Sequence, residues 1–206
     1  MIPAAELDGA RDATATVRAL VDGTPDLTAP SLLPGWSRAH VVAHIACNAR
    51  GLERMLQGVL DGVPGEMYPG GAEGRARDIE RLAQDPAGAV DELHRGAEDL
   101  ENAWNRTTDW EALVQPLRGG PVPASALAYM RWREVAVHTV DLGAGYLPAD
   151  WPQAFLDRFL VELRARPDLP PLDGVRGPDA AMAAWLSGRS NGEGLTGQLP
   201  DLPQWI

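Results

Sequence analysis

Hydrophobic residues recur at helical spacing in four long stretches of the chain. The first predicted helix covers residues 4–21 and ends at the turn 22–25. Its inward positions are Leu7, Ala10, Ala13, Val17, Leu20 and Val21. A second helix follows the tight turn 33–37, in which Ser37 is placed as the N-cap, and it continues to about Leu60. Both stretches have one hydrophobic face and one polar face, which is typical of helices that share a core.

The middle of the chain is more polar. Residues 62–74 are rich in proline and glycine and predict a long loop that could form the wall of an active site. The charged stretch 75–106 predicts one or two exposed helices broken at Asp85-Pro86. Its expected buried positions are Leu82, Val90, Leu93, Ala97, Leu100 and Trp104. A further helix is expected from near Ala124 to Leu142, with Gly143 at its C-terminal cap. Four such helices favour a bundle, and bundle cores often hold metal sites built from facing helices.

The last sixty residues differ in texture. We expect a helix over 151–166, an irregular segment over 167–178, a short helix over 179–186 and a glycine-rich tail after it. This part is too rich in proline to hold much core of its own. The predicted organisation is therefore a bundle domain over residues 1–146 and a small segment, residues 147–206, that packs on it.

Composition narrows the functional classes. The formal charge of −11 argues against nucleic acid or an anionic membrane as a partner. The sequence contains no lysine, which excludes Schiff-base chemistry and a P-loop lysine, and its single cysteine, Cys47, cannot form an internal disulfide. No stretch resembles GxGxxG following a strand or GxSxG at a nucleophile elbow, and none resembles a membrane span or a signal peptide. We expect a cytoplasmic protein, monomeric or homodimeric.

Few groups in the chain can carry out chemistry, and three of them have metal-ligand character. Glu134 and His138 are four residues apart on a predicted helix, so their side chains share a face. One histidine from a neighbouring helix, such as His44, would complete a set of three ligands with an open fourth position, as catalytic zinc sites have. Asp141 could orient a ligand histidine or cap a loop.

Spacing alone leaves other interpretations open. Glu134 and His138 could be an ordinary helical pair, and His44 could be a histidine of the core. His40, His44 and Cys47 lie on one predicted helix and could bind a structural zinc ion, as in zinc-binding anti-sigma factors.

Three stretches together resemble the mycothiol-dependent maleylpyruvate isomerase family, within the DinB-like four-helix metalloproteins. The first is 33–49, a Gly-Trp-Ser turn that leads into His40-x-x-x-His44. The second is 122–142, with its pattern Arg133-Glu134-x-x-x-His138-x-x-Asp141-Leu142. The third is the tail 188–206.

The resemblance implies a mainly α fold: a DinB-like four-helix bundle with a short, reduced C-terminal appendage. It implies that His44, Glu134 and His138 bind zinc or another divalent metal, with water or the thiol of mycothiol in the fourth position. It also implies that Arg189 binds a substrate carboxylate. The chain departs from the family at 166–177, which is too short and proline-rich for the strands that a full C-terminal domain carries there.

The implied function is a zinc- and mycothiol-dependent cis–trans isomerisation of maleylpyruvate or a similar unsaturated diacid, by reversible thiolate addition. The partners would then be a small-molecule thiol and a small electrophilic substrate, whose carboxylates Arg131, Arg133 or Arg189 could hold. One alternative is a mycothiol S-transferase acting on another electrophile. A second is a non-catalytic zinc-binding sensor or interaction module.

Overall fold

The structure is a computed structural model that describes residues 1–205, and its chain divides into two compact units. The first unit spans Met1–Ala144, and the second begins at Gly145. Five helices make up most of the first unit: α1 (Ala4–Asp22), α2 (Arg38–Asp61), α3 (Gly71–Ala83), α4 (Pro86–Arg106) and α5 (Ala126–Asp141). Between α4 and α5, the short strands β1 (Leu113–Val114) and β2 (Val122–Pro123) pair in antiparallel fashion, with Val114 opposite Val122.

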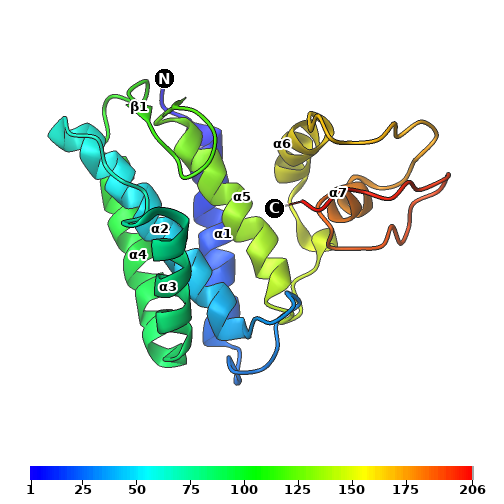
Figure 1. Cartoon of the computed structure of the whole chain (residues 1–206), viewed down its shortest axis with the longest axis horizontal. Helices are drawn as coiled ribbons and strands as arrows, with labels where there is room; N and C mark the ends of the chain where they lie inside the picture. The colour runs from blue at the N-terminus through cyan, green and yellow to red at the C-terminus, as the bar shows by residue number, and fades with distance from the viewer. Residues whose placement is uncertain (206) are drawn as a thin grey trace. The chain divides into compact units, whose positions relative to one another are not determined.

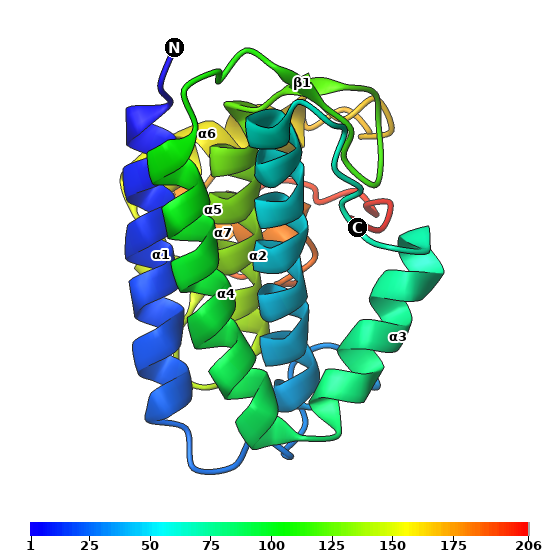
Figure 2. The same cartoon turned by 90° about the vertical axis from the view of Figure 1, so that its left-hand side faces the viewer.

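Helices α1, α2, α4 and α5 form a four-helix bundle, as predicted (Figures 1 and 2). The most extensive helix contacts are those of α2 with α4 and of α1 with α5. Helix α3 lies outside the four and packs mainly on α2 (Figure 2). None of the helices described in the structure is both long and apolar enough to cross a lipid bilayer.

Local signals predicted several helix ends correctly. Ser37 caps α2, because its Oγ accepts from the His40 backbone amide and the His40 ring accepts from the Ser37 amide. The break between α3 and α4 falls at Asp85-Pro86, where the Asp85 carboxylate accepts from the amide of Gly88. The loop expected over 62–74 is shorter than predicted, since α3 already begins at Gly71. Gly70 turns the chain into α3 at a φ of +76°, a conformation that glycine adopts without strain.

The prediction of which α3 and α4 residues are buried is only partly correct. Leu93, Leu100 and Trp104 are buried, whereas Leu82, Val90 and Ala97 are only half-buried. Small residues take the remaining inward positions of α4, namely Ala89, Gly96 and Ala103. Small side chains let the backbones of α2 and α4 approach closely, and a search for large hydrophobic residues overlooks them.

Two glycines on the bundle helices give a matched test of this packing. A Cβ added at Gly9 of α1 would lie within 2.6 Å of three ring carbons of Trp132 on α5, so Gly9→Ala forces a shift in the core. A Cβ at Gly96 would meet Ala49 at an ordinary 3.5 Å. We expect Gly9→Ala to lower the free energy of unfolding by about 1–3 kcal/mol. Gly96→Ala should be neutral or stabilising by up to about 1 kcal/mol, because alanine favours helix. Urea denaturation measures both, and equal destabilisation would contradict the packing.

The second unit contains the 3₁₀ turn η1 (Pro148–Asp150), α6 (Gln153–Arg164) and α7 (Asp179–Leu186). The helix expected from residue 151 begins only at Gln153, because Trp151 precedes a proline and is extended, with ψ of 128°. The irregular segment 167–178 and the short helix 179–186 are as predicted. One antiparallel bridge joins Arg176 to Thr196. Four stacked or edge-on rings form a small aromatic core: Trp151, Phe155, Phe159 and Trp205.

Candidate metal centre

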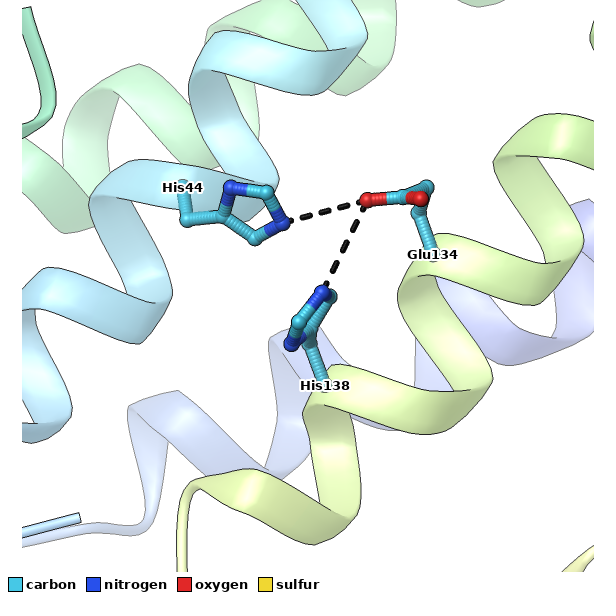
Figure 3. A group of neighbouring side chains, drawn as sticks. All are labelled: His44, Glu134 and His138. Carbon is cyan, nitrogen blue, oxygen red and sulfur yellow. Dashed lines mark hydrogen bonds and ion pairs between the residues drawn. The ribbon is translucent and has the colours of Figure 1, made fainter. Parts of the chain in front are cut away.

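Three potential metal ligands converge between α2 and α5 (Figure 3). His44 comes from α2, and Glu134 and His138 come from successive turns of α5. The carboxylate oxygen Glu134 Oε2 lies 3.1 Å from His44 Nε2 and 3.6 Å from His138 Nε2. One ligand atom from each residue lies within 4.8 Å of the other two. The structure thus brings together the three residues that the sequence singled out.

The positions of these side chains follow from the two helices. The spacing of four residues places Glu134 and His138 on one face of α5. His44 lies in a run of buried α2 residues and is only 2% exposed. The rings of His44 and His138 meet nearly edge to face, with centroids 4.2 Å apart. Trp36, in the turn before α2, lies beside His44 at 5.8 Å between ring centroids.

Asp141 fixes the orientation of His138. Its Oδ2 atom is 2.8 Å from His138 Nδ1, and its side chain is buried. A carboxylate at this position accepts the Nδ1 proton and leaves Nε2, which faces Glu134, with a free lone pair. Of the two roles considered for Asp141, this contact supports the one in which it orients a histidine.

The surroundings of the cluster shift the pKa values of His44 and Glu134 downward. Burial is the main cause that lowers the pKa of His44, to about 4, and the neighbouring His138 adds to it against the opposing effect of Glu134. Burial acts to raise the pKa of Glu134. The hydrogen bond with His44 and the charges of His138 and Arg133 outweigh it and hold that pKa well below its usual range. At neutral pH the site therefore offers a neutral His44 and an ionised carboxylate.

Arg75 is a member of this site that the sequence did not predict. Its Nη2 atom lies 2.8 Å from His44 Nδ1, and its guanidinium sits over the ring of Tyr68 at 5.5 Å. Arg75 belongs to α3, which the charge pattern marked as an exposed helix. Nothing in its local sequence indicates that it reaches a histidine 31 residues away.

The structural-zinc alternative on α2 is not formed. His40 is engaged in the helix cap through Nδ1, and its Nε2 lies 3.2 Å from Glu80. Cys47 is buried, which is the main cause that raises the pKa of its thiol to about 11, so it is not a ready thiolate ligand. Among residues 1–205, the side chains that meet with metal-ligand spacing are His44, Glu134 and His138.

The three arginines considered for holding carboxylates have different surroundings. Arg131 is fully buried, and its Nη1 donates to the Ile45 carbonyl at 2.7 Å and to Asn48 at 2.9 Å, so it is a core residue and not a substrate ligand. Arg133 Nη2 lies 3.4 Å from Glu134 Oε1. Arg189 belongs to the second unit, where it donates to the Ser187 carbonyl and lies over the Trp205 ring. Its role toward a substrate stays a prediction.

The donor set suits zinc or a similar divalent ion. Two imidazole nitrogens and one carboxylate oxygen from two rigid helices match a three-ligand site with one open position. The Asp141–His138 contact supplies the usual outer carboxylate. One contact does not suit it: His44 Nδ1 faces a donor, Arg75, where a metal-bound histidine would itself carry a proton.

Comparison with known proteins gives this arrangement a family. Residues 7–143 match the sequence model of the mycothiol maleylpyruvate isomerase N-terminal domain. The chain belongs to this family. The solved structures similar to it include a crystal structure of the mycothiol-dependent maleylpyruvate isomerase, with 28% identity and a TM-score of 0.90 over 100% of this chain and 98% of that one. A histidine-to-alanine variant of that enzyme matches with 26% identity, a TM-score of 0.90 and the same coverage. No curated protein matched the chain significantly.

These matches confirm the predicted family, the mainly helical DinB-like fold and an enzyme of the isomerase type. The match extends over 98% of the isomerase structure and so includes the C-terminal unit of this chain.

The contact between Asp141 and His138 gives a testable prediction. Asp141→Asn should keep the shape of the side chain but weaken divalent-metal affinity by roughly 10–100-fold, because an amide orients and polarises the imidazole less well. Competition with a chromophoric chelator measures the affinity. Asp91→Asn, the same change at an exposed position of α4, is the control and should bind metal as the wild type does. Equal affinities for all three proteins would show that Asp141 does not support a metal ligand.

Proposed function

We propose that the protein is a zinc- and mycothiol-dependent enzyme that converts maleylpyruvate, or a similar cis-unsaturated diacid, into its trans isomer. The observation that carries this proposal is the His44, Glu134 and His138 cluster, which lies within the segment that matches the isomerase family. The similarity to the solved isomerase along the whole chain supports the same assignment.

In this proposal each member of the cluster has a defined task. His44 and His138 supply nitrogen ligands, and Glu134 supplies the negative charge that lies between them. When bound, the metal would hold and deprotonate the thiol. Reversible addition of the thiol to the double bond of the substrate would leave a single bond, about which the substrate can rotate. Asp141 keeps the His138 ring in its ligating orientation.

The acidic substrate needs cationic groups besides the metal. We propose Arg189 as one of them, because a guanidinium pairs with a carboxylate through two parallel hydrogen bonds. The proposed partners are thus a small thiol and a small dianionic electrophile. The oligomeric state and the cytoplasmic location stay predictions.

A reconstitution assay tests the proposal. Metal-free protein is mixed with maleylpyruvate and mycothiol, with and without one equivalent of zinc, and fumarylpyruvate formation is followed. We expect conversion only when both zinc and the thiol are present. Equal rates without zinc would contradict the role of the metal, and equal rates without the thiol would contradict the role of mycothiol.

A further inference from the structure

The hydrogen bond between Arg75 and His44 fixes which ring nitrogen carries the proton. A guanidinium has only donors, so Arg75 Nη2, 2.8 Å from His44 Nδ1, requires that nitrogen to accept. The neutral His44 ring then carries its proton on Nε2, which donates to Glu134 Oε2 at 3.1 Å. In this arrangement the nitrogen that faces the cluster has no lone pair to offer.

A metal ion at the cluster requires the opposite tautomer. The ion would take the lone pair of His44 Nε2, and the ring proton would then reside on Nδ1. An Nδ1–H group cannot accept from Arg75, so the contact between the two donors would become repulsive. We infer that Arg75 and a divalent metal ion compete for His44, and that the guanidinium released by the ion becomes a carboxylate-binding group of the same site.

The surroundings of Arg75 show what it would bind once released. Among residues 1–205, its buried Nε atom has no hydrogen-bond partner, and Nη2 would lose its partner His44. Nε–H and Nη2–H lie on one edge of the guanidinium plane, so together they form the fork that a carboxylate occupies with both oxygens. The ring of Tyr68 under the guanidinium, at 5.5 Å, holds it near the cluster.

This inference rests on the proposed function, because it assigns Arg75 a role next to the proposed metal. It implies that the empty and loaded forms of the site differ in one contact: Arg75 satisfies His44 when no metal is bound and an anion when it is. The contact between Arg75 and His44 thereby lowers the affinity of the site for the metal. A dicarboxylate that binds the displaced guanidinium restores this affinity.

Substitution of Arg75 tests the competition, because it should raise the affinity for a metal and lower the affinity for a dicarboxylate. Cobalt affinity is measured against a chromophoric chelator, and maleate is then titrated into the cobalt-loaded protein while its visible spectrum is recorded. Compared with the wild type, we expect Arg75→Met to bind cobalt at least about tenfold more tightly and maleate at least about tenfold more weakly. Arg77→Met is the control, since Arg77 is an exposed arginine of the same helix whose ion pair is with Glu73. It should match the wild type in both measurements.

Each other outcome has a definite meaning. Unchanged or weaker cobalt binding by Arg75→Met, with the wild type binding cobalt, overturns the competition but leaves the proposed function standing. Tighter cobalt binding with unchanged maleate affinity overturns the anion-binding role. If neither protein binds cobalt although both are folded by circular dichroism, the proposed metal site fails, and the inference fails with it.

A measurement on the unaltered protein gives an independent check. Nitrogen-15 NMR of the imidazole rings reports which nitrogen of His44 is protonated. We expect the Nε2–H tautomer in the metal-free protein and the Nδ1–H tautomer after zinc is added. An Nδ1–H tautomer in the metal-free protein would overturn the inference.

Discussion

Replacement of Glu134 with glutamine is expected to weaken divalent-metal binding by roughly 100-fold or more. Glu134 Oε2 lies between the two histidines, at 3.1 Å from His44 Nε2 and 3.6 Å from His138 Nε2, so it occupies the centre of the ligand set. Glutamine has nearly the same shape but carries no charge, and a neutral amide oxygen is a poor zinc ligand. The metal content of purified, dialysed protein and chelator competition measure the effect.

A matched control separates the loss of a ligand from a general loss of negative charge. Glu80→Gln removes a carboxylate that lies 3.2 Å from the ring nitrogen Nε2 of His40 and accepts from Gln84 Nε2 at 3.5 Å. This variant should retain its metal. If Glu134→Gln keeps full metal content, Glu134 is not a ligand, and the proposed metal site is wrong.

Replacement of Arg189 with alanine is expected to lower kcat/KM by roughly 10²–10³-fold while metal content stays unchanged. The reason is that a doubly charged substrate would lose one of its two-hydrogen-bond partners, whereas no proposed metal ligand is altered. Turnover and zinc content are measured on the same sample. Arg176→Ala, which removes an exposed arginine of the same unit, is the control and should turn over as the wild type does.

Arg189 also has contacts that could make it structural. It donates to the Ser187 carbonyl and lies over the ring of Trp205 at 5.0 Å. Thermal unfolding of Arg189→Ala therefore accompanies the assay. Loss of turnover with an unchanged Tm agrees with a substrate role. Full activity of the variant contradicts the proposed carboxylate contact, and a large fall in Tm with activity unchanged below it assigns Arg189 to the packing of the tail.

The parts of the fold that depend on local signals could be predicted from the sequence. The cap at Ser37, the break at Asp85-Pro86 and the short helix at 179–186 each depend on neighbouring residues, and each is present in the structure. The pairing of Glu134 with His138 is likewise local, because helical geometry alone places them on one face. The contact of His44 with these two residues depends on the tertiary structure. The family resemblance predicted it, and helical periodicity did not.

The residues that could not be predicted are those whose partners are distant in sequence. Arg75 lies in the charged stretch 75–106, which predicts exposed helices, and Arg131 was expected to be available to a substrate carboxylate. Arg131 is instead buried at the bundle core, where a backbone carbonyl and Asn48 compensate for part of its desolvation. Arg75 reaches back from α3 to His44 because α3 packs on α2. Both placements depend on how the helices pack against each other. The hydrophobic pattern of a helix does not predict how that helix is aligned with its neighbour.

In the proposed function, mycothiol is a cofactor of an isomerisation and is not consumed. The most direct test of this role supplies zinc-loaded protein with maleylpyruvate and a small fraction of an equivalent of mycothiol, and then follows both compounds by NMR until the reaction stops. We expect that nearly all maleylpyruvate becomes fumarylpyruvate and that the free thiol is recovered. Conversion that stops after one equivalent of thiol is consumed, with a thioether as product, would contradict it and identify an S-transferase.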